Sequence, residues 1–534
     1  MNRNDVHVAN TSDLRDGEMK EVSIGESRIL LARVNDSFHA VSATCPHYGA
    51  PLAEGVLCGT RVVCPWHHAA FNVVSGKLEE PPALDGLKSY DVHVEGERIL
   101  IDIGTKTEDP PTHKIAFDDP RQFVIIGAGA AGYAAAQTLR EEGFRGSVVM
   151  LTRENRAPYD RPNLSKDYLH GHADPEWMPL RSDEFFKDLG IKLILNSEVT
   201  RVDPRAKMIT FENGDTMDYD ALLVATGGAP VRLNISGSDL KNVCRLRTFA
   251  DADSIIETAN RSRRAVVIGA SFIGMEAAYS LRERGLDVTV VAPSREPFEA
   301  VLGAEVGALF RREHEKHGIK FKLGAVVYRF EGSHDIEAVV LDNGEYIETD
   351  MVVVGVGVRP VTQFLEGVEL DFDGGVIVDS KLCAADGIYA AGDIASFVDP
   401  RRGKRTRIEH WRTAQQQGRT AARNMAGHDE VFDAVPFFWT RQFDIGLLYV
   451  GHATSWDKII YRGDVSSQDF LAFYIKDGQV QAVAGMNRDR EMAAAEELMR
   501  LGRMPSADQL KFEDLSLVEM LHSPESVRER ALIV

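Results

Sequence analysis

Alternation of apolar and polar positions marks an N-terminal region of short strands. Stretches such as SRILLARVN and RVVCPWH alternate in this way, and YDVHVEGERILIDIG predicts a hairpin that turns at Glu95-Gly96. A polar stretch with several prolines follows at 105–120 and is typical of a linker. We therefore predict an all-β domain over residues 1–104.

An internal repeat occupies the middle of the chain. FVIIGAGAAGYAAAQTLREEGFRGSVVMLTRE begins at Phe123, and AVVIGASFIGMEAAYSLRERGLDVTVVAPSRE begins at Ala265. Each copy has an apolar strand, a glycine turn, an alanine-rich helix and a second apolar strand, which is the pattern of a βαβ unit with buried parallel strands. Two copies predict two α/β nucleotide-binding domains, one over 121–250 with 371–430 and one over 251–370.

The pattern changes again in the C-terminal hundred residues. IGLLYVGHA, KIIYRG and FLAFYIKDGQVQAVAGMN predict strands, with a turn at Asp477-Gly478, and REMAAAEELMRLG predicts a helix. We expect a separate α+β domain over 435–534.

Charge and cysteine content narrow the functional classes. With 61 basic and 81 acidic residues, the net charge of −20 argues against a nucleic-acid partner, whose phosphates would be repelled. The N-terminal sequence has no apolar core of a secretory signal, and no apolar run reaches membrane-spanning length. Five scattered cysteines in 534 residues do not form a disulfide framework, so we expect a cytoplasmic protein.

Two segments of the predicted β domain combine cysteine with histidine. CPH supplies Cys45 and His47, CPWH supplies Cys64 and His67, and sixteen residues separate the pairs. Such a set satisfies a tetrahedral zinc ion, and it also holds a [2Fe–2S] cluster with cysteines on one iron and histidines on the other. Zinc fingers usually place both cysteines in one knuckle, whereas here each segment supplies one cysteine and one histidine, which favours the cluster.

The pattern C-x-H followed by C-x-x-H resembles that of the Rieske proteins, and the resemblance continues to Tyr90-Asp91-Val92. It implies a [2Fe–2S] cluster whose metal ligands are Cys45, His47, Cys64 and His67. His68 stands one place late, so we expect it to be a polar loop residue that points elsewhere. Ala50 and Trp66 stand where high-potential relatives have a disulfide, which implies the lower-potential branch.

The first glycine turn has the full context of a dinucleotide site. Gly127 permits the tight turn, Gly129 lets the backbone approach a pyrophosphate, and Gly132 lets helix and strand pack closely. Glu154 follows the second strand at about the distance of a ribose-binding acid.

Three further segments resemble the flavoprotein reductases that serve ferredoxins and the apoptosis-inducing factor family. They are APYDRPNLSKDYL at 157–169, LLVATGGAP at 222–230 and IYAAGDIASF at 388–397. The resemblance implies FAD, with Arg161 and Lys166 lying on it and Asp393 bonded to its ribityl chain. It also implies flavin-site residues in the second signature and in later segments, namely Thr226, Gly227, Trp411 and Trp439.

The second repeat has the corresponding turn, with Gly269, Ser271 and Gly274, where serine replaces the middle glycine. By resemblance, it binds NAD(P)H, Phe272 and Glu276 lie near the flavin and nicotinamide rings, and Lys166 and Glu276 form an ion pair beside the flavin. The strand after the helix ends at Ala292-Pro293, without the acid that selects NAD, so NADH is favoured only on family grounds.

The predicted fold is thus multidomain: an N-terminal all-β Rieske domain, two α/β Rossmann-like domains for FAD and NAD, and a C-terminal α+β domain. The whole chain resembles Rieske-containing, apoptosis-inducing-factor-like oxidoreductases. This implies an enzyme that passes electrons from NAD(P)H through FAD to the cluster and then to an acceptor such as an oxygenase or haem monooxygenase. The alternative is an NADH-responsive redox sensor with slow turnover. The expected partner is an acceptor protein or small redox acceptor, and a homodimer is left open.

Overall fold

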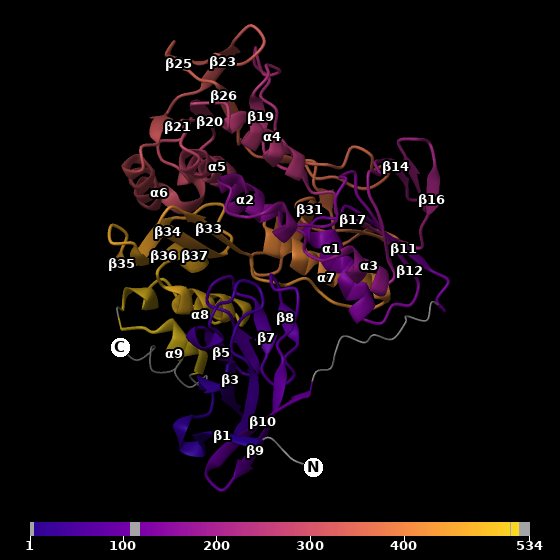
Figure 1. Ribbon diagram of the computed structural model, residues 1–534, viewed down its shortest axis with the longest axis vertical. Helices are drawn as coiled ribbons and strands as arrows, with labels where there is room; N and C mark the ends of the chain where they lie inside the picture. The colour runs from indigo at the N-terminus through magenta and orange to yellow at the C-terminus, as the bar shows by residue number, and fades with distance from the viewer. Residues whose placement is uncertain (1–4, 107–117, 513, 523–534) are drawn as a thin grey trace. The chain divides into compact units, whose positions relative to one another are not determined.

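The computed structural model describes residues 5–106, 118–512 and 514–522, and these residues form two compact units. The first unit contains residues up to 106 together with 434–439 and the described residues from 447 onward. The second contains residues 118–433 and 440–446. Figure 1 labels many of the elements of both units. Most of the predicted linker at 105–120 lies outside the described residues.

Two antiparallel sheets form the N-terminal part of the first unit and confirm the predicted all-β domain. The predicted hairpin is present, because Glu95 lies opposite Arg98 in neighbouring strands. The six-stranded sheet has the spatial order β1 (Asp5–Asn10), β10 (Arg98–Lys106), β9 (Ser89–Glu95), β4 (Ser37–Ser42), β3 (Ser27–Val34), β2 (Met19–Ile24). The four-stranded sheet has the order β5 (Val56–Cys58), β6 (Arg61–Val63), β7 (Ala70–Asn72), β8 (Leu78–Glu80).

The C-terminal strands and helix also occur where the sequence predicts them. Their sheet has the order β33 (Phe437–Gln442), β34 (Ile445–Gly451), β37 (Gln479–Met486), β36 (Asp469–Lys476), β35 (Lys458–Asp464). The helices that follow are α8 (Asp489–Arg500) and α9 (Leu517–His522). Strand β33 begins in the first unit, and its residues from Thr440 belong to the second.

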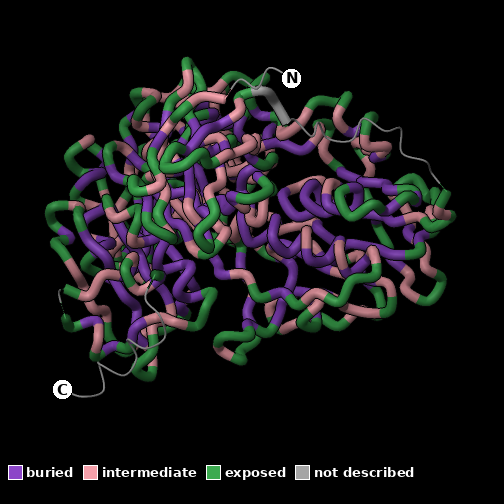
Figure 2. Tube along the Cα trace, turned by 90° about the horizontal axis from the view of Figure 1, so that it is seen from below, coloured by how far each residue is buried: buried purple, intermediate pink, exposed green. Residues whose placement is uncertain are grey.

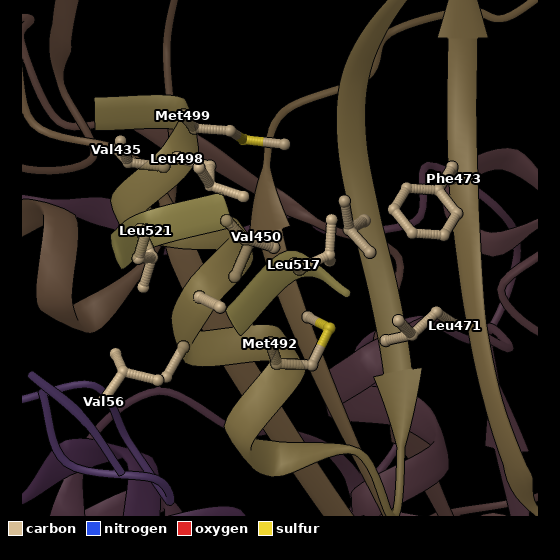
Figure 3. Close-up of a cluster of buried hydrophobic side chains, with 14 of the residues drawn as sticks. Val56, Val435, Val450, Leu471, Phe473, Met492, Leu498, Met499, Leu517 and Leu521 are labelled. Atoms are coloured by element: carbon tan, nitrogen blue, oxygen red, sulfur yellow. The ribbon is translucent and has the colours of Figure 1, made fainter. Parts of the chain in front are cut away.

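The C-terminal region shares its core with the small N-terminal sheet. Val56 of β5 packs in one buried cluster with Phe473 of β36 and with Met492 and Leu498 of α8 (Figure 3). The sequence predicts an α+β domain over 435–534, and the described residues of this region from 447 onward belong to one compact unit with the N-terminal sheets. The two regions share a core because β5 and β6 are only three residues long. Their apolar side chains are buried by packing against α8.

Two parallel sheets form the second unit and confirm the predicted βαβ repeats. The first has the order β13 (Ile191–Ile194), β12 (Ser147–Leu151), β11 (Gln122–Ile126), β17 (Ala221–Val224), β30 (Ile388–Ala390), with β29 (Cys383–Ala385) antiparallel at its edge. The second has the order β19 (Val243–Arg245), β26 (Met351–Val354), β20 (Arg264–Ile268), β21 (Asp287–Ala292), β22 (Lys320–Leu323). The helices of the two repeats are α1 (Ala130–Glu141) and α5 (Phe272–Glu283).

Smaller elements complete the second unit. Its other helices are α2 (Asp167–His170), α3 (Asp183–Asp188), α4 (Phe249–Ala259), α6 (Glu299–Lys316) and α7 (Trp411–Ala426). Its small sheets comprise β14 (Val199–Asp203), β15 (Met208–Phe211) and β16 (Thr216–Asp218); β18 (Gly228–Pro230) and β27 (Val358–Pro360); β23 (Val327–Glu331), β24 (Ala338–Leu341) and β25 (Tyr346–Glu348); β28 (Val376–Ile377), β31 (Ala395–Asp399) and β32 (Lys404–Thr406). Short 3-10 helices occur at 161–165 and 175–177 in this unit, and at 11–13, 52–54 and 509–511 in the first unit.

Burial follows the repeat pattern closely. The strands β11 and β20 are almost entirely buried, as expected for parallel strands covered on both faces, and Figure 2 shows buried stretches of chain alternating with exposed turns. Among the described residues, no helix is both long enough and apolar enough to span a membrane.

Candidate functional site

The two loops that carry the predicted cluster ligands have the same backbone hydrogen bonds. In each loop the cysteine amide donates to the carbonyl five residues later, and the amide four residues later donates back to the cysteine carbonyl. The bonds are Cys45 N to Ala50 O (2.9 Å), Gly49 N to Cys45 O (3.0 Å), Cys64 N to Ala69 O (2.8 Å) and His68 N to Cys64 O (3.2 Å). The predicted strand RVVCPWH therefore ends at Val63, and CPWH forms the second loop.

The structure brings the four predicted ligands together. Cys45 and Cys64 are both 1% exposed, and their thiols share a hydrogen bond. The Nδ1 atoms of His47 and His67 lie 3.1 Å apart. Two thiols and two imidazoles at one place are the donor set of a Rieske cluster, so the residues present fit that group.

Proton affinities differ among the predicted ligands. The hydrogen bond that the Cys45 thiol donates to the Cys64 sulfur, followed by burial, raises the pKa of Cys45, whereas the same bond lowers the pKa of Cys64. Backbone N–H groups of each loop donate to the sulfurs, which also favours thiolates. Burial lowers the pKa of His47 to about 4, so this imidazole is neutral at physiological pH, as a ligand must be.

Trp439 of β33 lies against the two ligand histidines. Its ring centroid is 4.5 Å from that of His67 and 6.2 Å from that of His47. The family resemblance implies that Trp439 lies near a flavin, and no pattern in the sequence indicated its contact with the histidines. Trp411, the other predicted flavin-site tryptophan, is the first residue of α7 and is partly buried.

His68 points away from the ligands, as expected, but it is fully buried rather than a simple loop residue. Its Nδ1 lies 2.5 Å from Oε2 of Glu496 on α8, and its ring stacks on Phe437 at 4.1 Å. His68 has φ +57°, and Gly49 has φ +81° at the equivalent position of the first loop. A non-glycine residue is strained in this region, so the contacts with Glu496 and Phe437 offset that strain.

A second acidic residue of α8 reaches the same sheet. Glu497 is fully buried, and its Oε1 accepts a hydrogen bond of 2.9 Å from Nε of Arg61 on β6. Glu496 and Glu497 thus link α8 to the cluster-binding part of the unit. No pattern in the sequence marks these two residues, because charged residues in an alanine-rich helix usually face water.

The first glycine turn has the shape of a dinucleotide site. Gly127 has φ +112°, and a Cβ on it would lie 2.2 Å from the carbonyl oxygen of Ala225. A Cβ on Gly132 would lie 1.8 Å from the carbonyl oxygen of Gly127, so helix and turn touch there. A Cβ on Gly129 would meet no protein atom within 4 Å, which leaves space at the N-terminus of α1 for a pyrophosphate.

Helix α7 covers α1 with polar side chains that have unused hydrogen-bonding capacity. A Cβ on Gly418 would lie 2.2 Å from the carbonyl oxygen of Ala131, so the two helices are in close contact. Thr413 Oγ1, Gln415 Oε1 and Gln417 Nε2 are buried without a hydrogen-bond partner among the described residues. Buried polar atoms of this kind are rare and fit a bound polar cofactor, here FAD. The signal in the sequence is TAQQQ, an uncharged polar run at the start of a helix.

Glu154 and Arg161 contact each other in this structure. Oε1 of Glu154 accepts from Nη2 of Arg161 at 2.7 Å, and Oε2 accepts from the Tyr159 hydroxyl at 2.6 Å. Burial alone would raise the pKa of Glu154, but the charge of Arg161 and the two hydrogen bonds outweigh it, so that pKa is lowered. A carboxylate held ionised at this place suits the ribose role that the sequence predicts.

The other two flavin signatures lie at the ends of parallel strands. Asp393, after β30, accepts a hydrogen bond of 2.7 Å at Oδ2 from Nη2 of Arg247. Thr226, after β17, donates from Oγ1 to the carbonyl oxygen of Val361 at 2.6 Å, and a Cβ on the next residue, Gly227, would lie 3.8 Å from Oδ2 of Asp393. These positions meet at the carboxyl edge of the sheet, where ligands of such folds bind.

The second repeat has the same turn. Gly269 has φ +108°, and a Cβ on Gly274 would lie 2.1 Å from the carbonyl oxygen of Gly269. Ser271 is exposed at the N-cap of α5, so its small side chain leaves the helix N-terminus accessible to a phosphate. Phe272 packs on Phe298 with ring centroids 4.8 Å apart.

Lys166 and Glu276 form the predicted ion pair. Lys166 Nζ lies 2.9 Å from Glu276 Oε2, which also accepts a hydrogen bond of 2.5 Å from Ser165. The other oxygen, Oε1, accepts a bond of 2.8 Å from Thr440 Oγ1. Glu276 is 3% exposed, and these bonds compensate the burial of its charge.

Comparison with known families agrees with this geometry. Three family models match the chain: the pyridine nucleotide-disulphide oxidoreductases over residues 121–418, the Rieske [2Fe-2S] domain over 4–91 and the reductase C-terminal domain over 437–521.

Individual relatives match over long stretches. Apoptosis-inducing factor 3 of Homo sapiens is 37% identical over 93% of this chain and 84% of its own length. The 5,5'-dehydrodivanillate O-demethylase ferredoxin reductase subunit of Sphingobium is 34% identical over 74% of this chain and 97% of its own. The solved covalent putidaredoxin reductase–putidaredoxin complex matches 75% of this chain and 98% of its own with 30% identity and a TM-score of 0.71.

Proposed function

Because the chain belongs to the pyridine nucleotide-disulphide oxidoreductase family and carries a Rieske [2Fe-2S] domain, we propose that it passes electrons from NAD(P)H through FAD to its own cluster and on to an external acceptor. It is an FAD- and NAD(P)H-dependent oxidoreductase. Disulfide reduction is not supported, because Cys244 in β19 and Cys383 in β29 belong to different sheets and are free cysteines. No other cysteine pair with redox-active spacing occurs in the sequence.

The observation that carries the proposal is a pair of consecutive residues in β33. The ring of Trp439 contacts the ligand histidine His67, and the next residue, Thr440, donates a hydrogen bond to Glu276. Glu276 pairs with Lys166, the pair that the family resemblance assigns to the flavin. One strand therefore supplies residues to both redox sites.

The order of electron transfer follows from the chemistry of the groups. When bound, FAD takes the two electrons of a hydride and releases them singly, as a one-electron cluster requires. The protein's part is positioning: Gly129 leaves room for the pyrophosphate, and Lys166 and Glu276 supply fixed charges. Backbone N–H groups of both loops donate to the sulfurs of Cys45 and Cys64, which would hold the cluster.

The acceptor is inferred from the relatives. One relative is a ferredoxin reductase subunit of an O-demethylase, and another was solved in a covalent complex with putidaredoxin. We propose an acceptor of that kind, a small redox protein or the oxygenase itself, with NADH as the favoured donor. We also propose a cytoplasmic setting, because cysteines remain free for a metal site under reducing conditions.

The test compares the holoprotein with a cluster-free His67→Ala variant that retains FAD. Both should reduce ferricyanide with NADH, whereas only the holoprotein should reduce cytochrome c at a kcat in the usual enzyme range of about 1–10³ s⁻¹. Equal cytochrome c reduction by both proteins would contradict the relay. Turnover far below this range with every acceptor would instead favour the slow redox sensor.

A further inference from the structure

Three metal-ligating side chains gather at the end of α2, outside the sites described above. Asp167 and His170 lie one helical turn apart, and His172 follows after Gly171, which has φ +90° and ends the helix. One ligand atom from each of the three lies within 4.8 Å of the others. Asp167 and His172 are exposed, whereas His170 turns inward.

His170 is a buried group with unused nitrogens. Its side chain is 3% exposed, and neither ring nitrogen has a hydrogen-bond partner among the described residues. The nearest carboxylate oxygen, Oδ1 of Asp167, lies 3.8 Å from Nδ1, which is too far for a hydrogen bond. The ring packs edge-on against Tyr279 at 4.3 Å. Burying an imidazole without hydrogen bonds raises the free energy of the folded protein. A ligand bound to the nitrogen that faces Asp167 would remove this penalty.

The protonation state of His170 suits metal binding. Burial, assisted by the neighbouring His172 and Arg284, lowers its pKa to about 4, while the charges of Asp167 and Glu276 oppose the shift. The imidazole is therefore neutral at physiological pH and does not have to lose a proton before it binds an ion.

The donor set identifies the class of ion. Two imidazoles and one carboxylate are typical of zinc and its neighbours, whereas calcium and magnesium prefer oxygen ligands alone. Ligand atoms on a tetrahedral zinc lie about 3.3 Å apart, so the exposed Asp167 and His172 must rotate slightly toward His170. The Arg284 guanidinium, which donates to the carbonyl of Leu169, places a positive charge near His170. This charge would lower the affinity of the three residues for a cation.

We propose that Asp167, His170 and His172 bind a divalent transition metal ion of the zinc class, with a fourth position open to water. The site goes beyond the electron relay, since none of its residues is a cluster or dinucleotide ligand. It immediately follows Lys166, so a bound ion would fix the helix next to the Lys166–Glu276 pair.

A second group serves as an internal control. Glu313, His317 and Asp444 meet the same distance criterion, but Oε2 of Glu313 already bonds Nζ of Lys316 at 2.8 Å. His317 stacks flat on Phe443 at 3.8 Å. A cation beside the carboxylate and a ring held by stacking both oppose a metal ion, so we expect this group to bind none.

The experiment is equilibrium dialysis of the holoprotein against zinc sulfate, with zinc and iron measured together so that an intact cluster is verified. We expect one zinc per chain, and binding at least about tenfold weaker in His172→Ala and in Asp167→Asn, both of which change exposed side chains. His317→Ala should bind zinc as the unchanged protein does.

Three results would overturn the proposal. They are an unchanged protein that retains no zinc beyond the free concentration, His172→Ala and Asp167→Asn variants that both keep full affinity, and loss of binding in His317→Ala. Because neither variant of the proposed site alters the buried His170, a folding defect does not obscure the outcome, and circular dichroism verifies this.

Discussion

The cluster loops and the first glycine turn each hold a redox group, but they are supported differently. The glycine turn is a local structure, in which Gly132 packs on Gly127 only five residues away. The second cluster loop depends on remote residues, because His68 is anchored by Glu496, 428 residues further along the chain. The glycine turn should therefore tolerate substitutions in distant parts of the chain. The second cluster loop, in contrast, should be weakened by a substitution in α8.

The largest expected effect comes from a cluster ligand. His67→Ala removes one imidazole from the donor set and should abolish the cluster, measured as loss of iron and of the EPR signal of the reduced cluster, while FAD remains bound. The matched control is His68→Gly, since glycine suits the φ of +57° and occupies the equivalent place in the first loop. Cluster loss in His68→Gly with retention in His67→Ala would reverse the ligand assignment.

The next effect tests the open space at the glycine turn. Gly129→Ala adds a methyl group that meets no protein atom, so the apoprotein should keep its melting temperature. The same methyl group would meet the pyrophosphate, so we expect FAD affinity to fall by at least about tenfold, or 1.4 kcal/mol.

Fluorescence titration of the apoprotein with FAD measures this change. Gly446→Ala is the control, because a Cβ there also meets nothing within 4 Å but lies away from the turn. Unchanged FAD affinity in Gly129→Ala would show that the pyrophosphate does not lie there.

The remote support of the cluster loop predicts a loss of stability. Glu496→Ala removes the buried hydrogen-bond partner of His68 and should lower the free energy of unfolding of the first unit by about 1–3 kcal/mol. Urea denaturation measures this. Glu491→Ala, on the same helix but with a partly exposed pair to Arg488, should change it by less than about 1 kcal/mol.

A double-mutant cycle that combines Glu496→Ala with His68→Gly measures the contribution of the His68–Glu496 hydrogen bond to the free energy of unfolding. The two changes should be non-additive, since each removes the same interaction. Additive losses would mean that Glu496 does not act through His68.

The smallest effect concerns pH and Glu154. Its pKa is lowered in the folded protein relative to its ordinary value of 4.5, so its stabilising effect is present above that value and is lost as the pH falls through the lowered pKa. The gap in unfolding free energy between the unchanged protein and Glu154→Gln should be largest near neutral pH and shrink in acid. Urea denaturation at several pH values measures it, with the exposed Glu212→Gln as control. A gap that is constant with pH would contradict the assignment.

The same contrast explains how much the sequence could predict. The glycine turns, the βαβ repeats and the Cys–His pairs are encoded within short segments, and the structure has each of them. Ion pairing of Lys166 with Glu276 was predictable only by resemblance, because 110 residues separate them. The contacts of Trp439 with the ligand histidines and of Glu496 with His68 depend on how distant segments pack, and neither residue type signals such a partner. Nor did periodicity show that the C-terminal region shares a core with the small N-terminal sheet.

The central claim is that electrons from NAD(P)H reach the Rieske cluster of the same chain. Anaerobic titration of the holoprotein with NADH, followed by visible absorption and EPR, tests it most directly. We predict that flavin bleaching is accompanied by the EPR signal of a reduced Rieske cluster, in proportion to the electrons added. If the flavin bleaches and no such signal appears while dithionite still produces it, the intramolecular relay is contradicted.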